Sequence, residues 1–208
     1  MENFARDRLS GEPTGHDFWH AVRTRNNALH IQALEGGDTR IIVPASLLHD
    51  IGDRKVLGTE DDDHSIVRDF LAEIGLDESS INHILHIIEN MSYSKSIDNP
   101  DIDKTLEFQI VQDADRLDAL GAIGIARAFA YGGRAGRLIH DPEASAQEFT
   151  STAAYKASIG STLAHFDEKL LRLKGTFNTA TAREIAQSRD TYMHEFYNRF
   201  LEEWEGSR

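Results

Sequence analysis

Cysteine is absent from the 208-residue sequence. The chain therefore cannot form a disulfide framework, a thiolate metal site or a cysteine nucleophile, and any metal ion must be bound by histidine and carboxylate side chains. Proline is scarce, with four residues in all. No run of residues alternates β-branched with polar side chains, so strands are not expected.

Positive charge is also in deficit, with 22 Lys and Arg against 35 Asp and Glu, a net charge of -13. A surface of that sign repels the phosphates of nucleic acids and anionic membranes, so we expect neither as a partner. No segment has the length and apolarity of a signal peptide or a membrane span, and residues 1–9 already carry four charged side chains. These absences predict a cytoplasmic protein.

Apolar residues recur at three- and four-residue steps along most of the chain, which predicts an all-α fold. The expected helices cover about 16–35, 41–51, 62–75, 77–91 and 104–131, followed by two helices within 147–208. The length and the 40% hydrophobic content suit a single domain over 1–208. Within it we expect a helical core over 1–146 and a C-terminal helical hairpin over 147–208 that packs on the core.

Polar residues interrupt this apolar pattern at His49 and Asp50, which follow a small and apolar run over 43–48. A buried imidazole and carboxylate need a hydrogen-bond partner or a metal ion. Taken alone, the pair favours the ordinary reading of a hydrogen-bonded core histidine. However, His20 lies 29 residues upstream and Asp115 lies 65 residues after Asp50, each within an expected helix. Nitrogen and oxygen ligands on separate helices suit a first-row divalent ion.

The order His, His-Asp, Asp resembles the HD superfamily of metal-dependent phosphohydrolases. The similarity continues through the long block 112–127, QDADRLDALGAIGIAR, and through shorter stretches at 15–20, 45–55, 165–170 and 200–206. The chain is most similar to a small bacterial branch that includes nucleotide pyrophosphohydrolases. The resemblance implies an HD-domain helical bundle whose metal ligands are His20, His49, Asp50 and Asp115.

The resemblance also implies hydrolysis of a phosphoanhydride bond in nucleoside triphosphates by metal-bound water. A single divalent ion is expected, with Mn²⁺ or Mg²⁺ favoured and Fe²⁺, Ni²⁺ or Zn²⁺ also compatible with these ligands. Two alternatives stay open: a 5'-nucleotidase or phosphodiesterase on the same metal, and a nucleotide-binding regulatory domain without turnover. The expected partner is a small nucleotide, and a homodimer is a further expectation.

Other polar residues near these motifs are candidates for catalysis and substrate binding. They are Asp53 and Lys55 for catalysis, His16, Arg23 and Arg127 for substrate binding, and Asp118 for a hydrogen bond to a metal-binding histidine. Asp53 stands where some HD hydrolases have a catalytic Glu, so it would orient or deprotonate the water. The cations would bind phosphate. Each of them is equally compatible with ordinary surface or helix-pairing charge.

Three more histidines, His64, His83 and His86, lie where some HD phosphodiesterases bind a second metal ion. Those enzymes have a His-His pair at the end of the corresponding helix, and this chain has Glu89 and Asn90 there. We therefore expect one ion, with His83 and His86 as ordinary helix residues.

Overall fold

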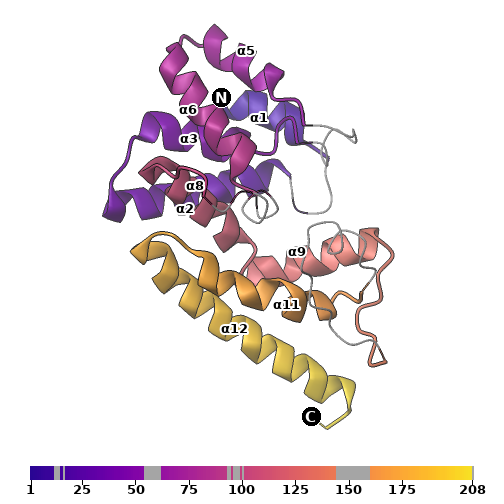
Figure 1. The fold of residues 1–208 in the computed structure, drawn as a ribbon. Helices are drawn as coiled ribbons and strands as arrows, with labels where there is room; N and C mark the ends of the chain where they lie inside the picture. Colours follow the sequence, from indigo (N-terminus) through magenta and orange to yellow (C-terminus); the bar gives the residue numbers. More distant parts are fainter. Residues whose placement is uncertain are drawn as a thin grey trace. The chain divides into compact units, whose positions relative to one another are not determined.

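The computed structural model describes residues 1–11, 15, 17–53, 62–92, 95, 99, 101–143 and 160–207. Every regular element in these ranges is a helix, which confirms the all-α prediction (Figure 1). The chain divides into two compact units, Met1–Asp115 and Arg116–Arg208. The expected single domain over 1–208 stays a prediction. None of the described helices is long and apolar enough to cross a lipid bilayer.

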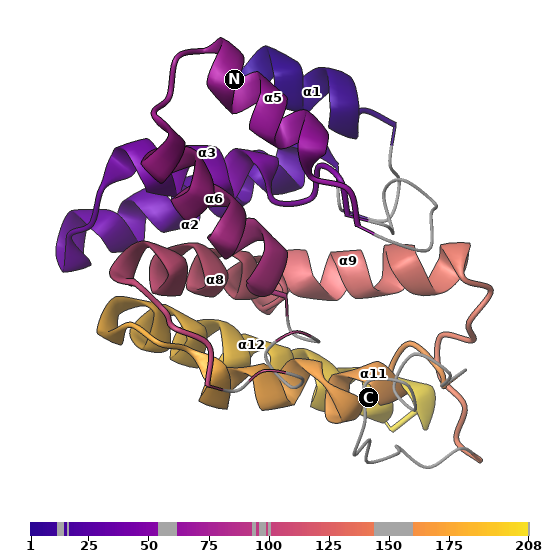
Figure 2. The same ribbon diagram turned by 45° about the horizontal axis from the view of Figure 1, so that its top comes forward.

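The first unit is a bundle in which α2 packs on α3 and α3 packs on α6 (Figure 2). Its helices are α1 (Glu2–Leu9), α2 (Phe18–Glu35), α3 (Thr39–Leu48), α5 (Ser65–Glu73), α6 (Glu78–Asn90) and most of α8 (Leu106–Asp118). Mostly aliphatic side chains fill the core between these helices. The largest fully buried ones are Leu9, Ile31, Ile42, Leu47, Leu48, Leu71, Ile81, Ile84, Ile87, Phe108 and Ile110.

Aspartates fix the starts of three of these helices. The side chains of Asp17, Asp38 and Asp77 accept hydrogen bonds from backbone N–H groups in the first turns of α2, α3 and α6. Such caps satisfy donors that have no partner within the helix. The expected starts of α2 and α6 are therefore confirmed to within two residues. Helix α3, expected over about 41–51, ends at Leu48 instead of residue 51, so His49 lies at its C-terminal cap.

The second unit contains α9 (Gly121–Arg134), α11 (Ala164–Glu168), the 3₁₀ helix η1 (Leu170–Thr176) and α12 (Ala180–Trp204). Both α9 and η1 pack along α12 (Figure 2). The described part of the first arm of the expected hairpin consists of α11 and η1, and residues 147–159 of that hairpin lie outside the described residues. Phe129, Phe166, Phe196 and Phe200 form an aromatic cluster with ring centroids 5.9–6.2 Å apart.

The expected continuous helix over 104–131 is wrong, because the structure breaks it after Asp118. Leu120 is extended, with φ -113° and ψ 160°, and Gly121 has a φ of +70° that disfavours other residues. At Gly124, a Cβ atom would lie 2.2 Å from the Ala119 carbonyl oxygen. Gly121 and Gly124 therefore make room for the break.

Candidate metal centre

His20 enters the site from the first turn of α2. Its backbone N–H donates to the side chain of Asp17 at 2.9 Å, so the residue that caps the helix also fixes the backbone of His20. The imidazole is only 1% exposed. Its Nε2 atom lies 3.1 Å from His49 Nε2. Two imidazoles from different helices therefore present the same ring atom to one point.

His49 follows the last residue of α3, and its ring closes back on that helix. His49 Nδ1 lies 3.0 Å from the Ser46 carbonyl oxygen. Since a carbonyl can only accept, Nδ1 carries the proton and donates, and Nε2 of the neutral ring keeps its lone pair. The end of the helix thus selects the tautomer in which His49 can bind a metal ion.

Two carboxylates complete the cluster. Asp50 Oδ2 lies 3.5 Å from Nε2 of both His20 and His49. Asp115, on α8, places Oδ1 at 3.3 Å from His20 Nε2 and at 3.8 Å from His49 Nε2. Its side chain is 31% exposed, so the cluster is open to solvent on the side of Asp115. All four expected ligands are therefore brought together within the first unit.

The separations measured from the two Nε2 atoms suit a divalent cation. Ligand atoms held at about 2.1 Å from one ion and at right angles to each other lie about 3 Å apart, close to the 3.1–3.8 Å separations reported above. His49 Nε2 and the carboxylate oxygens offer lone pairs that a cation can accept. His20, His49 and Asp50 form a candidate metal-binding group within the described residues.

The turn after Asp50 holds the pair in place. Gly52 has a φ of +90°, and a Cβ atom there would lie 2.1 Å from the Asp63 carbonyl oxygen. The Gly52 carbonyl accepts from Asp63 N at 2.8 Å, and His64 Nδ1 donates to the Ile51 carbonyl at 3.1 Å. Hydrogen bonds therefore join residues 51 and 52, which follow the His49-Asp50 pair, to residues 63 and 64.

The other expected site residues of the first unit stay predictions. Arg23 is half-buried on α2, one turn after His20. Asp53 is half-buried in the turn after Asp50, with its backbone N–H donating to the Asp50 carbonyl at 3.3 Å. His16 and Lys55 lie outside the described residues.

Asp118 and Arg127 pair with each other in the second unit. Arg127 donates to Asp118 Oδ2 at 2.9 Å, and the Asp118 side chain is 2% exposed. Both residues were expected near the site, Arg127 on a substrate phosphate and Asp118 on a histidine. Those roles stay predictions, and the ion pair supplies a structural reason for the presence of both residues.

The additional histidines have ordinary hydrogen-bond partners. His64 Nδ1 contacts the Ile51 carbonyl, His83 Nε2 contacts Thr105 Oγ1 at 2.8 Å, and His86 Nε2 contacts the Asp103 carbonyl at 3.1 Å. These contacts support the interpretation of His83 and His86 as structural residues of α6.

Two contacts that position the ligands correspond to no motif in the sequence. Asn27 Nδ2 donates to the Ala114 carbonyl at 3.3 Å and so links α2 to α8 beside Asp115. The Ser46 carbonyl orients His49, as described above. Asn27 is one of several polar residues on α2, and a backbone carbonyl leaves no trace in the sequence. Only the spacing of Asn27 from His20, seven residues or two turns, could have suggested a shared face.

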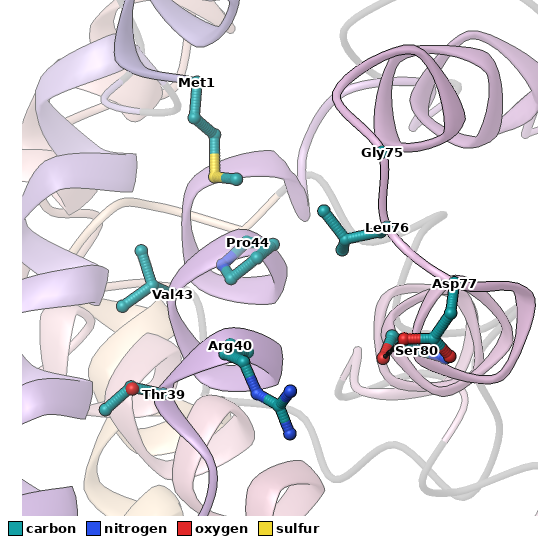
Figure 3. Close-up of a pocket in the computed structure, with 9 residues that line it drawn as sticks. All are labelled: Met1, Thr39, Arg40, Val43, Pro44, Gly75, Leu76, Asp77 and Ser80. Carbon is teal, nitrogen blue, oxygen red and sulfur yellow. Dashed lines mark hydrogen bonds between the residues drawn. The ribbon is translucent and has the colours of Figure 1, made fainter.

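A pocket with a volume of about 410 Å³ lies elsewhere in the first unit, between α3 and α6 (Figure 3). Its lining residues are Met1, Thr39, Arg40, Val43, Pro44, Gly75, Leu76, Asp77 and Ser80. Hydrogen bonds from Ser79 and Ser80 hold the pKa of Asp77 well below its usual range, as expected for a helix cap. None of the four clustered ligands lines this pocket.

Comparison with known proteins identifies the family. Residues 18–120 match the model of the HD domain, a domain that binds divalent metals. YpgQ of Bacillus subtilis is 36% identical over 196 residues, which cover 94% of this chain and 88% of YpgQ. The crystal structure of YpgQ in complex with ADP has a TM-score of 0.75 at 34% identity, covering 98% of this chain and 97% of YpgQ.

Two other crystal structures share the fold. A Lactobacillus plantarum protein has a TM-score of 0.86 at 35% identity, covering 99% of this chain and 95% of its own. An HD-superfamily hydrolase from Bacillus thuringiensis has a TM-score of 0.74 at 39% identity, covering 98% and 94%. Together with the domain match, these similarities show that the chain belongs to the HD superfamily and is a metal-dependent phosphohydrolase.

Proposed function

We propose that the protein hydrolyses a phosphoanhydride bond of nucleoside triphosphates, with one divalent ion held by His20, His49, Asp50 and Asp115. The observation that carries the proposal is the convergence of two imidazole nitrogens and two carboxylate oxygens within 3.1–3.8 Å contacts. Neutral histidine and carboxylate ligands suit Mn²⁺ or Mg²⁺, and Fe²⁺, Ni²⁺ or Zn²⁺ are also compatible.

When bound, such an ion supplies Lewis acidity toward a phosphoryl oxygen and a water molecule of lowered pKa. The chain supplies the rest. The hydrogen bond of His49 Nδ1 to Ser46 keeps the other ring nitrogen pointing at the cluster. Asp53 is proposed to orient the attacking water and take its proton. Arg23, Arg127 and Lys55 are proposed to bind phosphate oxygens, which an otherwise acidic surface would repel.

A nucleotide substrate is supported by YpgQ, whose crystal structure is in complex with ADP. ADP contains the kind of bond that the proposal breaks. The same ion and ligands would also serve a 5'-nucleotidase or a phosphodiesterase, and a domain without turnover would bind nucleotide in the same way. Products separate these functions, whereas metal content does not.

The deciding experiment incubates the protein with Mn²⁺ and a panel of nucleoside triphosphates, monophosphates and cyclic nucleotides. Inorganic phosphate, pyrophosphate and nucleoside are measured for each. Release of pyrophosphate together with a nucleoside monophosphate is expected. Nucleoside and phosphate released from monophosphates would instead identify a nucleotidase. If no compound in the panel is hydrolysed but ADP still binds, the regulatory-domain alternative replaces the proposal.

A further inference from the structure

Trp19 is a large apolar side chain left in solvent at the start of α2. Its indole is 55% exposed, whereas tryptophan is on average a highly buried residue. The neighbouring Phe18 is buried, and its ring meets the indole edge-on with centroids 5.3 Å apart. Contact with an anchored ring restrains the indole without covering it.

A cation lies on the same aromatic pair. The Arg6 guanidinium sits 4.2 Å from the Phe18 ring centroid and 5.2 Å from that of Trp19. Within the described part of the chain, no carboxylate lies within ion-pair distance of Arg6, so the aromatic faces are its main partners. An exposed indole beside a guanidinium is a surface on which a planar, electron-rich ring can stack.

The position of Trp19 on α2 relates it directly to the metal ligands. Trp19 precedes His20, so the two Cα atoms are about 3.8 Å apart. Arg23 follows Trp19 by four residues and His20 by three, so its side chain is next to both on the helix surface. A metal ligand, a phosphate-binding candidate and an exposed ring therefore lie within the first turns of one helix, with the indole on its exposed side and the His20 imidazole on its buried side.

We propose that the indole of Trp19 is the stacking platform for the base of the nucleotide, with its phosphates directed past Arg23 toward the His20 cluster. The inference rests on the proposed nucleotide substrate and adds the residue that binds the base. Stacking recognises the ring face, so Trp19 provides affinity for nucleotides in general and little preference among bases.

Tryptophan fluorescence gives a direct test, because the chain has only Trp19 and Trp204. Trp204 lies at the end of α12 in the second unit. In the Trp204→Phe protein, titration with ADP and Mg²⁺ should change the remaining emission in a saturable way. ADP binding measured by calorimetry with no change in emission would contradict the proposal.

Substitutions at Trp19 provide the second measurement. Trp19→Ala should weaken ADP binding about 5- to 100-fold by calorimetry. Trp19→Phe, which keeps a ring, should stay within about threefold of the parent, and both variants should bind Mn²⁺ as the parent does. A matched test with inorganic tripolyphosphate, which has no base, should show the same kcat/KM for Trp19→Ala and the parent.

These outcomes keep the two proposals apart. Hydrolysis of nucleoside triphosphates with equal KM in Trp19→Ala and the parent would overturn the base platform and leave the hydrolase intact. Fluorescence change and weakened ADP binding without turnover would support the platform and overturn the hydrolase. If ADP does not bind at any concentration tested, the platform is wrong.

Discussion

Two aspartates three residues apart on α8 have opposite surroundings. Asp118, in the second unit, meets the guanidinium of Arg127 at 2.9 Å. Asp115, in the first unit, faces the Nε2 atoms of His20 and His49 at 3.3 and 3.8 Å. The fold neutralises the first carboxylate with a cation of its own. The Asp115 carboxylate instead faces two nitrogen atoms that could bind a metal ion together with it. A paired carboxylate of the first kind serves the structure, and one of the second kind is a candidate ligand.

The same contrast extends to other buried charges of the second unit. Lys174 Nζ lies 3.2 Å from the buried Asp190, and Arg116 and Arg189 donate to the backbone carbonyls of Thr176 and Leu117. Burial lowers the pKa of Arg189, although Asp118 partly opposes the shift. Buried charges in this unit connect helices, whereas the four clustered groups of the first unit point at one another.

Loss of a ligand should have the largest effect. His49→Ala removes one nitrogen of the cluster and should lower both Mn²⁺ affinity and kcat/KM by more than about 100-fold, above the range typical of residues that only support a ligand. Metal content by mass spectrometry and turnover check this. The matched control is His86→Ala, which removes a histidine whose Nε2 contacts the Asp103 backbone carbonyl. Equal activity of His49→Ala and the parent would remove the metal mechanism.

Breaking the ion pair should reduce stability and spare the metal site. Asp118→Ala leaves Arg127 without its buried partner, which should lower the free energy of unfolding by about 3–5 kcal/mol. Urea denaturation measures the loss, and Mn²⁺ binding per folded molecule should be unchanged. The double variant Asp118→Leu with Arg127→Met should recover much of the lost free energy of unfolding. If Arg127→Met alone leaves the free energy of unfolding unchanged, the ion pair does not stabilise the fold and the comparison fails.

Gly52 tests how far the turn positions the ligand pair. In Gly52→Ala the residue would need a φ of +90°, and its Cβ would meet the Asp63 carbonyl at 2.1 Å. The turn must shift, so we expect a loss of about 1–3 kcal/mol in unfolding free energy and weaker Mn²⁺ binding. Gly75→Ala is the matched control, since its φ is also positive but no atom lies within 4 Å of the added Cβ. Similar Mn²⁺ affinity in both variants would show that the turn does not position Asp50.

A pH-dependent loss of stability that is absent near neutral pH is expected from His165 in the second unit. Burial lowers the pKa of His165 to about 3, and Lys169 and Arg137 add to the shift. The unfolded chain, with a pKa near 6.5, therefore binds a proton that the folded chain excludes. Its contribution to stability is full above about pH 6.5 and is lost as the pH falls toward 3, by about 1.4 kcal/mol per pH unit.

The His165→Gln variant isolates this contribution. Without the titrating ring, the unfolding free energy of metal-free protein should fall less steeply between about pH 6 and pH 4. Metal-free samples are required because the ligands of the first unit also release the ion in acid. Parallel pH profiles for the variant and the parent would contradict the prediction.

The sequence predicted the helical class and the four clustered residues, because the apolar periodicity and the His, His-Asp, Asp order can be recognised from the residue types alone. It did not predict the break at Leu120, where glycines are compatible with either close helix packing or a sharp turn. It also placed His49 inside a helix instead of at its end. Pairings such as that of Asp118 with Arg127 depend on how helices are oriented, and periodicity contains no information on that.

The contact between His49 Nδ1 and the Ser46 carbonyl fixes the imidazole before an ion binds. That carbonyl belongs to the last turn of α3, where backbone oxygens lack partners within the helix. The ring therefore completes the helix and is oriented as a ligand by one and the same bond. Folding itself preorganises this ligand, so the entropy of fixing the ring is already spent before a cation arrives.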